Sequence, residues 1–396
     1  MTYARSRLWL GISGVGCIVV LSSILLVTGL PLKVLPSGTT WSAGDVVALL
    51  SMIGLLFAAL LPLDLLGGLL LPNRSRPQTI TPVAFVTSWI RGVVTQGAMF
   101  LAASVLILAG GRAFGLGGAT VAVLGLAIML LAFQLPIAKW TGSLQSVDES
   151  EGKPDGSISK GKSSAAMDAA VEQTSQWGFK RKPVLILKHQ DSGFTGGIVG
   201  LPGMESLVIP AVLLEKLSTD QLAVVIARRL EAIQSGGRTR GILLALAWVL
   251  GGFVLSASLP GAGVASVGEL AMTCLGFTLW TFLGLLTLPT LSRQAAYAID
   301  RTMLDRGATP ETLHSAVQTL DRLQDDEPER SAWIETIFHP VPSVNNRRGE
   351  AASQWPIAWH AARMTLFVSW ACMGMLVRAV HCNVGRPELW VMLPTD

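Results

Sequence analysis

The stretch LSTDQLAVVIARRLEAIQSGGRTRGILLALAW, residues 217–248, predicts an amphipathic helix that leads directly into a membrane span. Ser218 is a favourable N-cap, and Gln221 three residues later completes a capping box. Gly236 and Gly237 can end the helix before the apolar run begins. An apolar stripe recurs at helical spacing, at Leu222, Val225, Ile226, Leu230 and Ile233.

Two adjacent arginines, Arg228 and Arg229, stand in the middle of this helix. An ordinary buried helix carries apolar or small residues at such positions, because Lys and Arg are almost never fully buried unless they are paired. The two arginines therefore mark the part of the chain where a function should be sought.

The composition around this helix is that of a membrane protein. Hydrophobic residues make up 51% of the chain and charged residues only 14%, whereas a soluble domain is usually about 25% charged. Seven apolar runs are long enough to predict membrane spans. They lie at 8–30, 44–70, 86–110, 117–138, 241–260, 269–291 and 364–381.

The basic residues predict the orientation of these spans. Most of the 30 Lys and Arg residues lie in the N-terminal segment, in the segment around Arg74, and in the two long polar stretches 139–240 and 292–363. Basic residues accumulate on the cytoplasmic side of membrane proteins. We therefore expect a multi-pass protein of the cell (inner or plasma) membrane whose main polar domain is cytoplasmic.

The spans and polar stretches predict the domain organisation. Short β-prone runs at 183–188, 194–199 and 206–209 indicate a small meander or hairpin. Each polar stretch is short for an independent domain, so the two halves are expected to pack on each other. The segments are a four-span membrane region over 1–140, a flexible linker over 141–176 with a helix near 164–173, a first domain half over 177–240, a membrane hairpin over 241–291, a second half over 292–363, and a last span and tail over 364–396.

Three motifs resemble the membrane zinc metallopeptidases of the HtpX and CAAX-prenyl-protease type. LSTDQLAVVIARRLEAI is similar to the zinc helix of that family, roughly L-S-x-x-[EQ]-L-x-A-V-x-A-H-E-x-x-H-I. SRQAAYAID (292–300) resembles its S-R-x-x-E-x-x-A-D segment, and FHPVPSVNNRR (338–348) resembles its His-Pro-Pro loop followed by an arginine. The resemblance covers about 177–363. It implies a multi-pass α-helical membrane protein of about seven spans, with a mostly α, small-β cytoplasmic metallopeptidase-like domain that the membrane hairpin splits.

The chain departs from this family at every position that carries its chemistry. The family needs two histidines at i and i+4, a glutamate beside the first as general base, and a third carboxylate ligand. A guanidinium stays protonated and cannot coordinate Zn²⁺. The corresponding residues here are Arg228, Arg229, Ala232 and Ala296.

The resemblance also places Asp300 where the family has an aspartate that orients the first zinc histidine. Since Arg228 occupies the histidine position, and since Ala232 and Ala296 leave room for a guanidinium, we predict that Arg228 pairs with Asp300. The alternative is that both arginines point to solvent or lipid phosphates.

Four further residues are candidates for lining the former site. Arg229 needs its own carboxylate or a wet cleft, and Glu335 is the candidate partner. His339 can share a helix face with Glu335, although a packed loop histidine is the simpler interpretation. Gly196 and Gly197 belong to GFTGGIVGLPG, which resembles the strand that the family lays beside its substrate.

These observations lead to one main function hypothesis and two alternatives. The main one is a catalytically dead pseudopeptidase without a cofactor, which binds segments of membrane proteins or regulates an active peptidase. The first alternative is an active HtpX-like metalloendopeptidase that holds zinc through unconventional ligands. The second is a transporter or channel component, for which Asp64 and Arg91 are predicted to pair between the second and third spans. The expected surroundings are a lipid bilayer, with no nucleic-acid partner.

Overall fold

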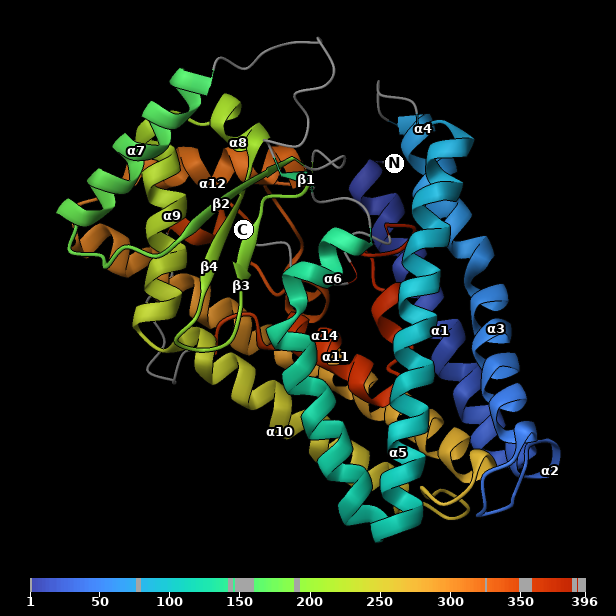
Figure 1. The fold of residues 1–396 in the computed structure, drawn as a ribbon. Coiled ribbons are helices and arrows are strands. Elements are labelled where there is room, and N and C mark those ends of the chain that lie inside the picture. Colours follow the sequence, from blue (N-terminus) through green and yellow to red (C-terminus); the bar gives the residue numbers. More distant parts are fainter. Residues whose placement is uncertain are drawn as a thin grey trace. The chain divides into compact units, whose positions relative to one another are not determined.

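The computed structural model describes residues 2–75, 80–141, 145–146, 160–188, 193–324, 326–348, 358–386 and 390. The chain forms two compact units, each built from three segments of the sequence. Figure 1 colours the ribbon by position in the sequence. The membrane unit comprises Met1–Phe133, Ala245–Leu285 and Met364–Val391, and the polar unit comprises Gln134–Leu244, Leu286–Arg363 and Met392–Asp396.

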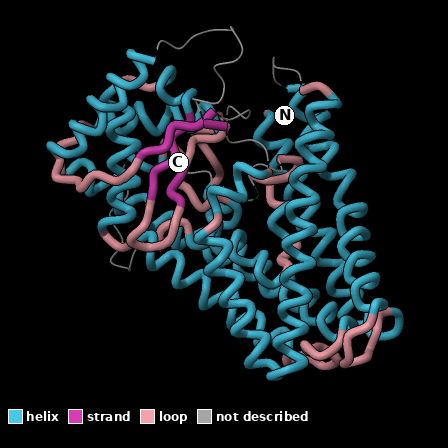
Figure 2. The backbone as a smooth tube through the Cα atoms, in the orientation of Figure 1, coloured by secondary structure: helices cyan, strands magenta, loops and turns pink. Residues whose placement is uncertain are grey.

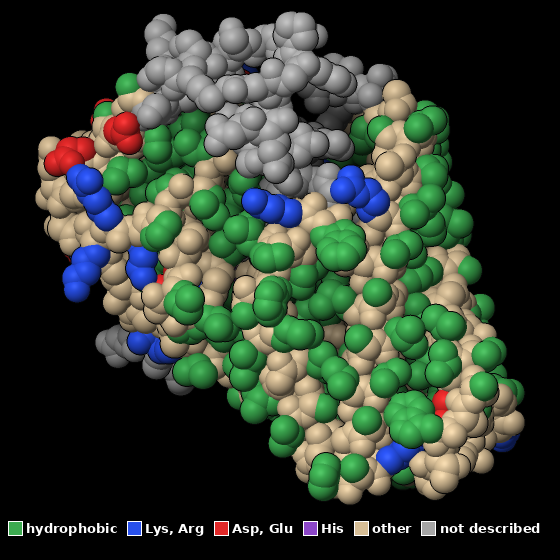
Figure 3. All heavy atoms as spheres, viewed as in Figure 1, with side chains coloured by type: hydrophobic (Ala, Val, Ile, Leu, Met, Phe, Trp, Pro, Cys, Tyr) green, Lys and Arg blue, Asp and Glu red, His purple; other side chains and the backbone are tan. Residues whose placement is uncertain are grey.

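Five helices in the described part of the chain are long and apolar enough to cross a membrane. Val and Leu side chains are exposed along α1 and α3, among them Leu21, Val27, Val47 and Leu55. Figure 3 shows how widely hydrophobic side chains cover one face of the molecule, as a surface in contact with lipid requires. The five are α1 (Tyr3–Thr28), α3 with its continuation (Ala43–Ser75), α5 (Pro82–Ala132), α10 (Gly237–Ala257) and α11 (Val267–Asp305).

The long helix α5 contains the predicted span 86–110 and most of the predicted span 117–138, whose last residues lie in α6 (Gln134–Trp140). Its regular geometry is broken at Gly115, where φ is 63° and ψ is −154°. A methyl group at Gly110 would lie 2.6 Å from the carbonyl oxygen of Gly118. Glycine suits both positions, because Gly115 has a positive φ and Gly110 lies too close to the backbone of Gly118 for a side chain.

The prediction of a continuous seventh span over 364–381 is wrong. This segment consists of the short helix α14 (Ala361–Val368) and the 3-10 turns η4 (Ser369–Cys372) and η5 (Leu376–Arg378). The chain turns at Met373, whose φ is 57°. Hydropathy alone favours a helix here, but it does not report such a turn.

The predicted Asp64–Arg91 pair is also wrong. Asp64 forms a buried ion pair with Arg378 and accepts a 2.9 Å hydrogen bond from Trp89 Nε1. The guanidinium of Arg378 lies 4.4 Å from the centroid of the Trp390 ring. Arg91 is exposed on the surface of α5, so its side chain points away from the interior where Asp64 lies.

The polar unit contains a four-stranded sheet in the order β1-β2-β4-β3, surrounded by helices (Figure 2). β2 pairs with β4 in parallel, and β3 pairs with β4 antiparallel, which supplies the predicted hairpin. The strands are β1 (Gln145–Ser146), β2 (Val184–Lys188), β3 (Gly197–Val199) and β4 (Ser206–Pro210), and the helices wholly within the unit are α6 (Gln134–Trp140), α7 (Lys160–Gln176), α8 (Ala211–Lys216), α9 (Thr219–Gln234), α12 (Pro310–Gln324) and α13 (Ala332–Phe338).

The helix α9 forms the centre of the polar unit. The predicted capping box is present: Gln221 N–H donates to Ser218 Oγ at 3.3 Å, and Ser218 N–H donates to Gln221 Oε1 at 2.9 Å. Every residue from 222 to 232 is buried. The helix is therefore enclosed on all sides rather than half exposed, and its charged residues must be satisfied inside the unit.

Helix α7 occupies much of the segment that was predicted as a flexible linker over 141–176. It packs against α9 and buries Met167 and Ala170 in the core. The helix predicted near 164–173 lies within it, and residues 160–176 form a helix where a flexible linker was predicted. Residues 142–144 and 147–159 lie outside the described residues. The buried residues described on α7 are Met167, Ala170 and Thr174, so the helix packs without a strongly hydrophobic composition.

Candidate functional site

The ion pair that the sequence predicts on α9 is present. Arg228 is buried, and its Nε donates to Asp300 Oδ1 on α11 at 2.8 Å. The first half of the polar domain is thereby joined to the second half across 72 residues of sequence.

A second arginine shares the same carboxylate. Arg347, in the 3-10 turn η3 (Asn346–Arg348), donates from Nε to Asp300 Oδ2 at 2.7 Å and from Nη2 to Oδ1 at 2.8 Å. This is the bidentate geometry in which arginine binds carboxylates most strongly. We call Arg228, Asp300 and Arg347 the arginine–aspartate cluster. The motif FHPVPSVNNRR indicated an arginine after the His-Pro-Val-Pro loop. It did not indicate that Arg347 binds Asp300.

The three side chains of the cluster are only 4–8% exposed, so their charges interact away from water. Removing one partner of a buried ion pair costs about 3–5 kcal/mol, since it leaves an uncompensated charge away from water. Asp300 receives three charge-assisted hydrogen bonds from two elements. It therefore holds α9, α11 and η3 in one arrangement.

Arg229 does not pair with Glu335, so that prediction is wrong. Its Nη1 donates to the carbonyl oxygen of Val208 at 3.1 Å, and its Nη2 donates to the carbonyl oxygen of Thr195. Glu335 instead accepts a 2.8 Å hydrogen bond from Asn346 Nδ2. Backbone carbonyls thus take the place of the expected carboxylate, and they cannot be recognised from residue types.

Gly196 packs closely against Arg229 and the backbone of Val208, where a side chain would not fit. Its φ is 90°, and a methyl group on it would lie 2.1 Å from the Val208 carbonyl oxygen and 3.1 Å from Arg229 Nη1. Gly196 and Gly197 are both buried, and β3 begins at Gly197. The predicted site-lining glycines therefore lie beside α9, against the second of its two arginines.

Gly196→Ala is expected to lower the free energy of unfolding by at least about 2 kcal/mol, because it combines a strained φ with a backbone clash. Chemical unfolding followed by tryptophan fluorescence measures the change. Gly203→Ala is the matched control, since Gly203 has a φ of 89° but nothing within 4 Å of the added methyl group. Equal losses in the two variants would show that the contact with Val208 and Arg229 contributes nothing.

The residues at the positions that the resemblance assigns to zinc ligands do not fit zinc. Zinc is held by thiolate, imidazole and carboxylate donors, whereas Ala232 and Ala296 offer only buried methyl groups. Arg228 directs a cationic donor at Asp300, and a cation in this position repels a metal ion. Among the described residues, no group of three or more His, Cys, Asp or Glu side chains is arranged to hold a metal.

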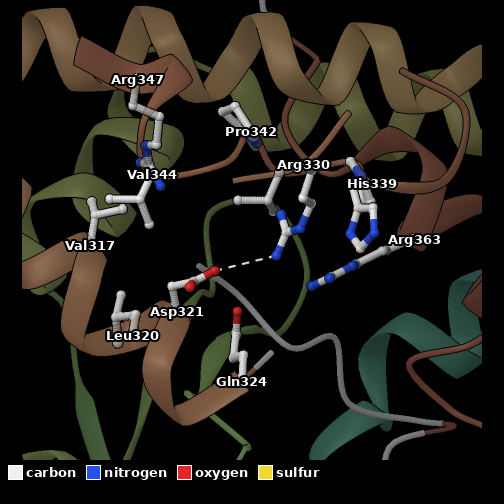
Figure 4. Close-up of a pocket in the computed structure, with 12 residues that line it drawn as sticks. Val317, Leu320, Asp321, Gln324, Arg330, His339, Pro342, Val344, Arg347 and Arg363 are labelled. Carbon is white, nitrogen blue, oxygen red and sulfur yellow. Dashed lines mark hydrogen bonds and ion pairs between the residues drawn. The ribbon is translucent and has the colours of Figure 1, made fainter. Parts of the chain in front are cut away.

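The predicted site residue His339 directly follows α13 in the chain. It is buried at the C-terminal end of α13 and lines a small pocket together with Arg347 (Figure 4). Glu335, one turn earlier, is turned toward Asn346. The two residues therefore do not form a remnant of a metal site with Arg228 or Asp300.

A search of solved structures finds a similar fold. The crystal structure of S. mikatae Ste24p matches with a TM-score of 0.61 and 14% sequence identity, over 78% of this chain and 75% of that chain. Ste24p is a CAAX prenyl protease of the zinc metalloprotease family. No protein-family model and no curated protein matches this sequence. The chain is thus a mostly helical, multi-pass membrane protein with a Ste24p-like fold.

Proposed function

We propose that this protein is a catalytically inactive member of the membrane metallopeptidase type, which binds or regulates other membrane proteins. The observation that carries the proposal is the arginine–aspartate cluster. It stands where the resemblance places the first zinc ligand and the aspartate that orients it. The Ste24p-like fold supports a peptidase scaffold, and the cluster supports a structural use of its former centre.

The chemistry of the site supports the loss of catalysis. A zinc peptidase needs a metal-activated water and a general base that accepts its proton. Arg229 stands at the position of the base, and a guanidinium cannot accept a proton in a protein. It is also committed to the carbonyl groups of Thr195 and Val208, so its side chain serves the packing of α9 on the sheet.

The expected partners are segments of membrane proteins or an active peptidase, and the polar unit is proposed to lie on the cytoplasmic side of the cell membrane. The distribution of Lys and Arg supports this orientation. The transporter alternative loses its main argument, because Asp64 is paired with Arg378 rather than with Arg91.

Zinc analysis and a proteolysis assay test the proposal together. Protein purified without chelator is expected to contain far less than one zinc per chain. Cleavage of unfolded membrane-protein and prenylated-peptide substrates is expected to equal the chelator-treated background. One tightly held zinc per chain, or cleavage that a chelator abolishes, would establish the alternative of an active metalloendopeptidase with unconventional ligands.

A further inference from the structure

The turn that joins β3 to β4 holds apolar side chains outside the core of the polar unit. It consists of Leu201, Pro202, Gly203 and Met204, and the Met204 N–H donates to the Leu201 carbonyl oxygen at 2.9 Å. Proline at the second position and glycine with a φ of 89° at the third are typical of a type II turn. Pro202 and Met204 are exposed, and Met204 is 77% exposed.

Glu205 fixes the shape of this turn. Its Oε1 accepts from the Gly203 N–H at 2.9 Å, and its Oε2 accepts from Lys182 Nζ at 2.8 Å. The Glu205 side chain is buried. The turn is therefore preformed, and it can bind a surface without the entropic cost of ordering a flexible loop.

Arg238 joins the base of the turn to the start of α10, a helix that can cross a membrane. Its buried Nη2 donates to the Gly200 carbonyl oxygen at 2.6 Å, and its Nη1 lies 4.0 Å from Glu205 Oε1. Figure 1 shows the turn between β3 and β4 at the end of the polar unit where α9 passes into α10. The turn and the first residues of α10 are thus held side by side.

The position of Leu243 on α10 indicates how close the turn lies to lipid. Leu243 is 59% exposed, as expected for an apolar residue on the lipid-facing surface of a span. It follows Arg238 by about 7–8 Å along the helix axis, at 1.5 Å per residue. The headgroup layer between water and hydrocarbon is about 5–8 Å thick on each side of a bilayer. The turn therefore lies at the level of this layer.

Basic residues surround the turn. Lys180 and Arg181 are exposed, and the Lys180 carbonyl oxygen accepts from Gln234 Nε2 at 3.2 Å, at the end of α9. This bond places the segment beside the start of α10, where Arg240 is also exposed. Apolar tips with a cationic rim are typical of surfaces that bind anionic membranes.

We propose that the turn 201–204 and the basic residues around it bind the bilayer surface through anionic phospholipid headgroups. Pro202 and Met204 enter the interfacial layer, and Lys180, Arg181 and Arg240 lie among the headgroups. This contact holds the β3–β4 hairpin at a fixed height above the hydrocarbon. The proposal does not depend on whether the protein cleaves peptides.

An environment-sensitive fluorophore on Met204→Cys tests the depth of the turn. The full chain carries Cys17→Ser and Cys382→Ser, because those two native cysteines are not buried, and is placed in nanodiscs that contain phosphatidylglycerol. The emission is expected to shift to shorter wavelength, to be quenched by lipids spin-labelled near the headgroup, and to resist quenching by iodide. Asp220→Cys is the matched control, because this exposed residue lies at the other end of α9, about 20 Å along the helix from Gln234.

A second arm tests the charge of the headgroups. Replacing phosphatidylglycerol by phosphatidylcholine is expected to weaken quenching by the spin-labelled lipid and to strengthen quenching by iodide. Lys180→Glu should reduce this difference between the two lipids, because it reverses a charge in the rim. Lys216→Glu is the control, since Lys216 is an exposed lysine that directly precedes the N-terminal end of α9. It should leave the difference unchanged.

Three outcomes would overturn the proposal. Equal emission and equal iodide quenching at positions 204 and 220 would place the turn in water. Protection from iodide without quenching by the spin-labelled lipid would mean that a second copy of the chain covers the turn. Equal behaviour in the two lipids, or equal effects of Lys180→Glu and Lys216→Glu, would remove the role of anionic headgroups.

Discussion

Asp300→Asn is expected to lower the free energy of unfolding of the polar unit by about 3–5 kcal/mol. The substitution keeps the size of the side chain but removes its charge. Arg228 and Arg347 would then remain buried around a neutral amide, which accepts through one oxygen rather than two. Denaturant unfolding in detergent micelles measures the loss.

Two comparisons show whether the loss arises from buried charge. Glu172→Gln removes an acid from an ion pair that is about 60% exposed, and it should change stability by less than about 1 kcal/mol. The triple variant Arg228→Met, Asp300→Leu, Arg347→Met removes all three charges. It should be more stable than Asp300→Asn, because well-packed apolar replacements often restore the stability of buried ion pairs.

The Asp300→Asn variant also tests whether the site holds a metal ion. If the cluster has replaced zinc as the tie between the two domain halves, added Zn²⁺ should not restore the stability of Asp300→Asn. A loss below about 1 kcal/mol would mean that Asp300 is not an important tie. Recovery by zinc would mean that the site still holds a metal.

Some contacts could be predicted because both partners are side chains in recognisable motifs. Arg228 and Asp300 belong to two motifs of one family resemblance, so their proximity followed from it. Arg347 was missed because the motif ends in two arginines, and nothing in the sequence indicates which one turns inward. Arg229 was assigned to a carboxylate, whereas its acceptors are the carbonyl groups of Thr195 and Val208.

Hydrophobicity predicted the long helices well and the irregular segments poorly. The reversal near Gly115 was indicated by the gap between the predicted spans 86–110 and 117–138. The break at Met373 was not, because the residues around it are mostly apolar and its positive φ occurs at a residue other than glycine. Helix α7 was read as a linker because its alanines contribute little hydrophobicity, although Ala170 is fully buried.

The pair between Asp64 and Arg378 could not be predicted from the sequence, for a different reason. The two residues are 314 positions apart, and the turn at Met373 that precedes Arg378 was not predicted. Arg91, only 27 positions from Asp64, offered a closer cation on the neighbouring predicted span. Proximity in sequence favoured the wrong partner, because the exposed and buried faces of a helix that is apolar all round cannot be distinguished by hydropathy.

Asp64→Leu is therefore expected to destabilise the membrane unit strongly, by about 3–5 kcal/mol. The substitution leaves the guanidinium of Arg378 without its carboxylate, and both side chains are 1% exposed. The rings of Phe57 and Trp390, at 4.8 and 4.4 Å from the guanidinium carbon, compensate only part of this charge. Unfolding in mixed micelles of increasing SDS content measures the change.

The identity of the partner is tested by a double-mutant cycle. Asp64→Leu combined with Arg378→Leu should be more stable than Asp64→Leu alone, and the coupling between the two positions should exceed about 2 kcal/mol, as for residues in direct contact. Arg91→Leu is the matched control, because it removes the exposed arginine of α5. It should show coupling to Asp64 below about 0.5 kcal/mol, as independent sites do. A larger coupling of Asp64 to Arg91 than to Arg378 would contradict the buried pair and restore the arrangement first predicted from the sequence.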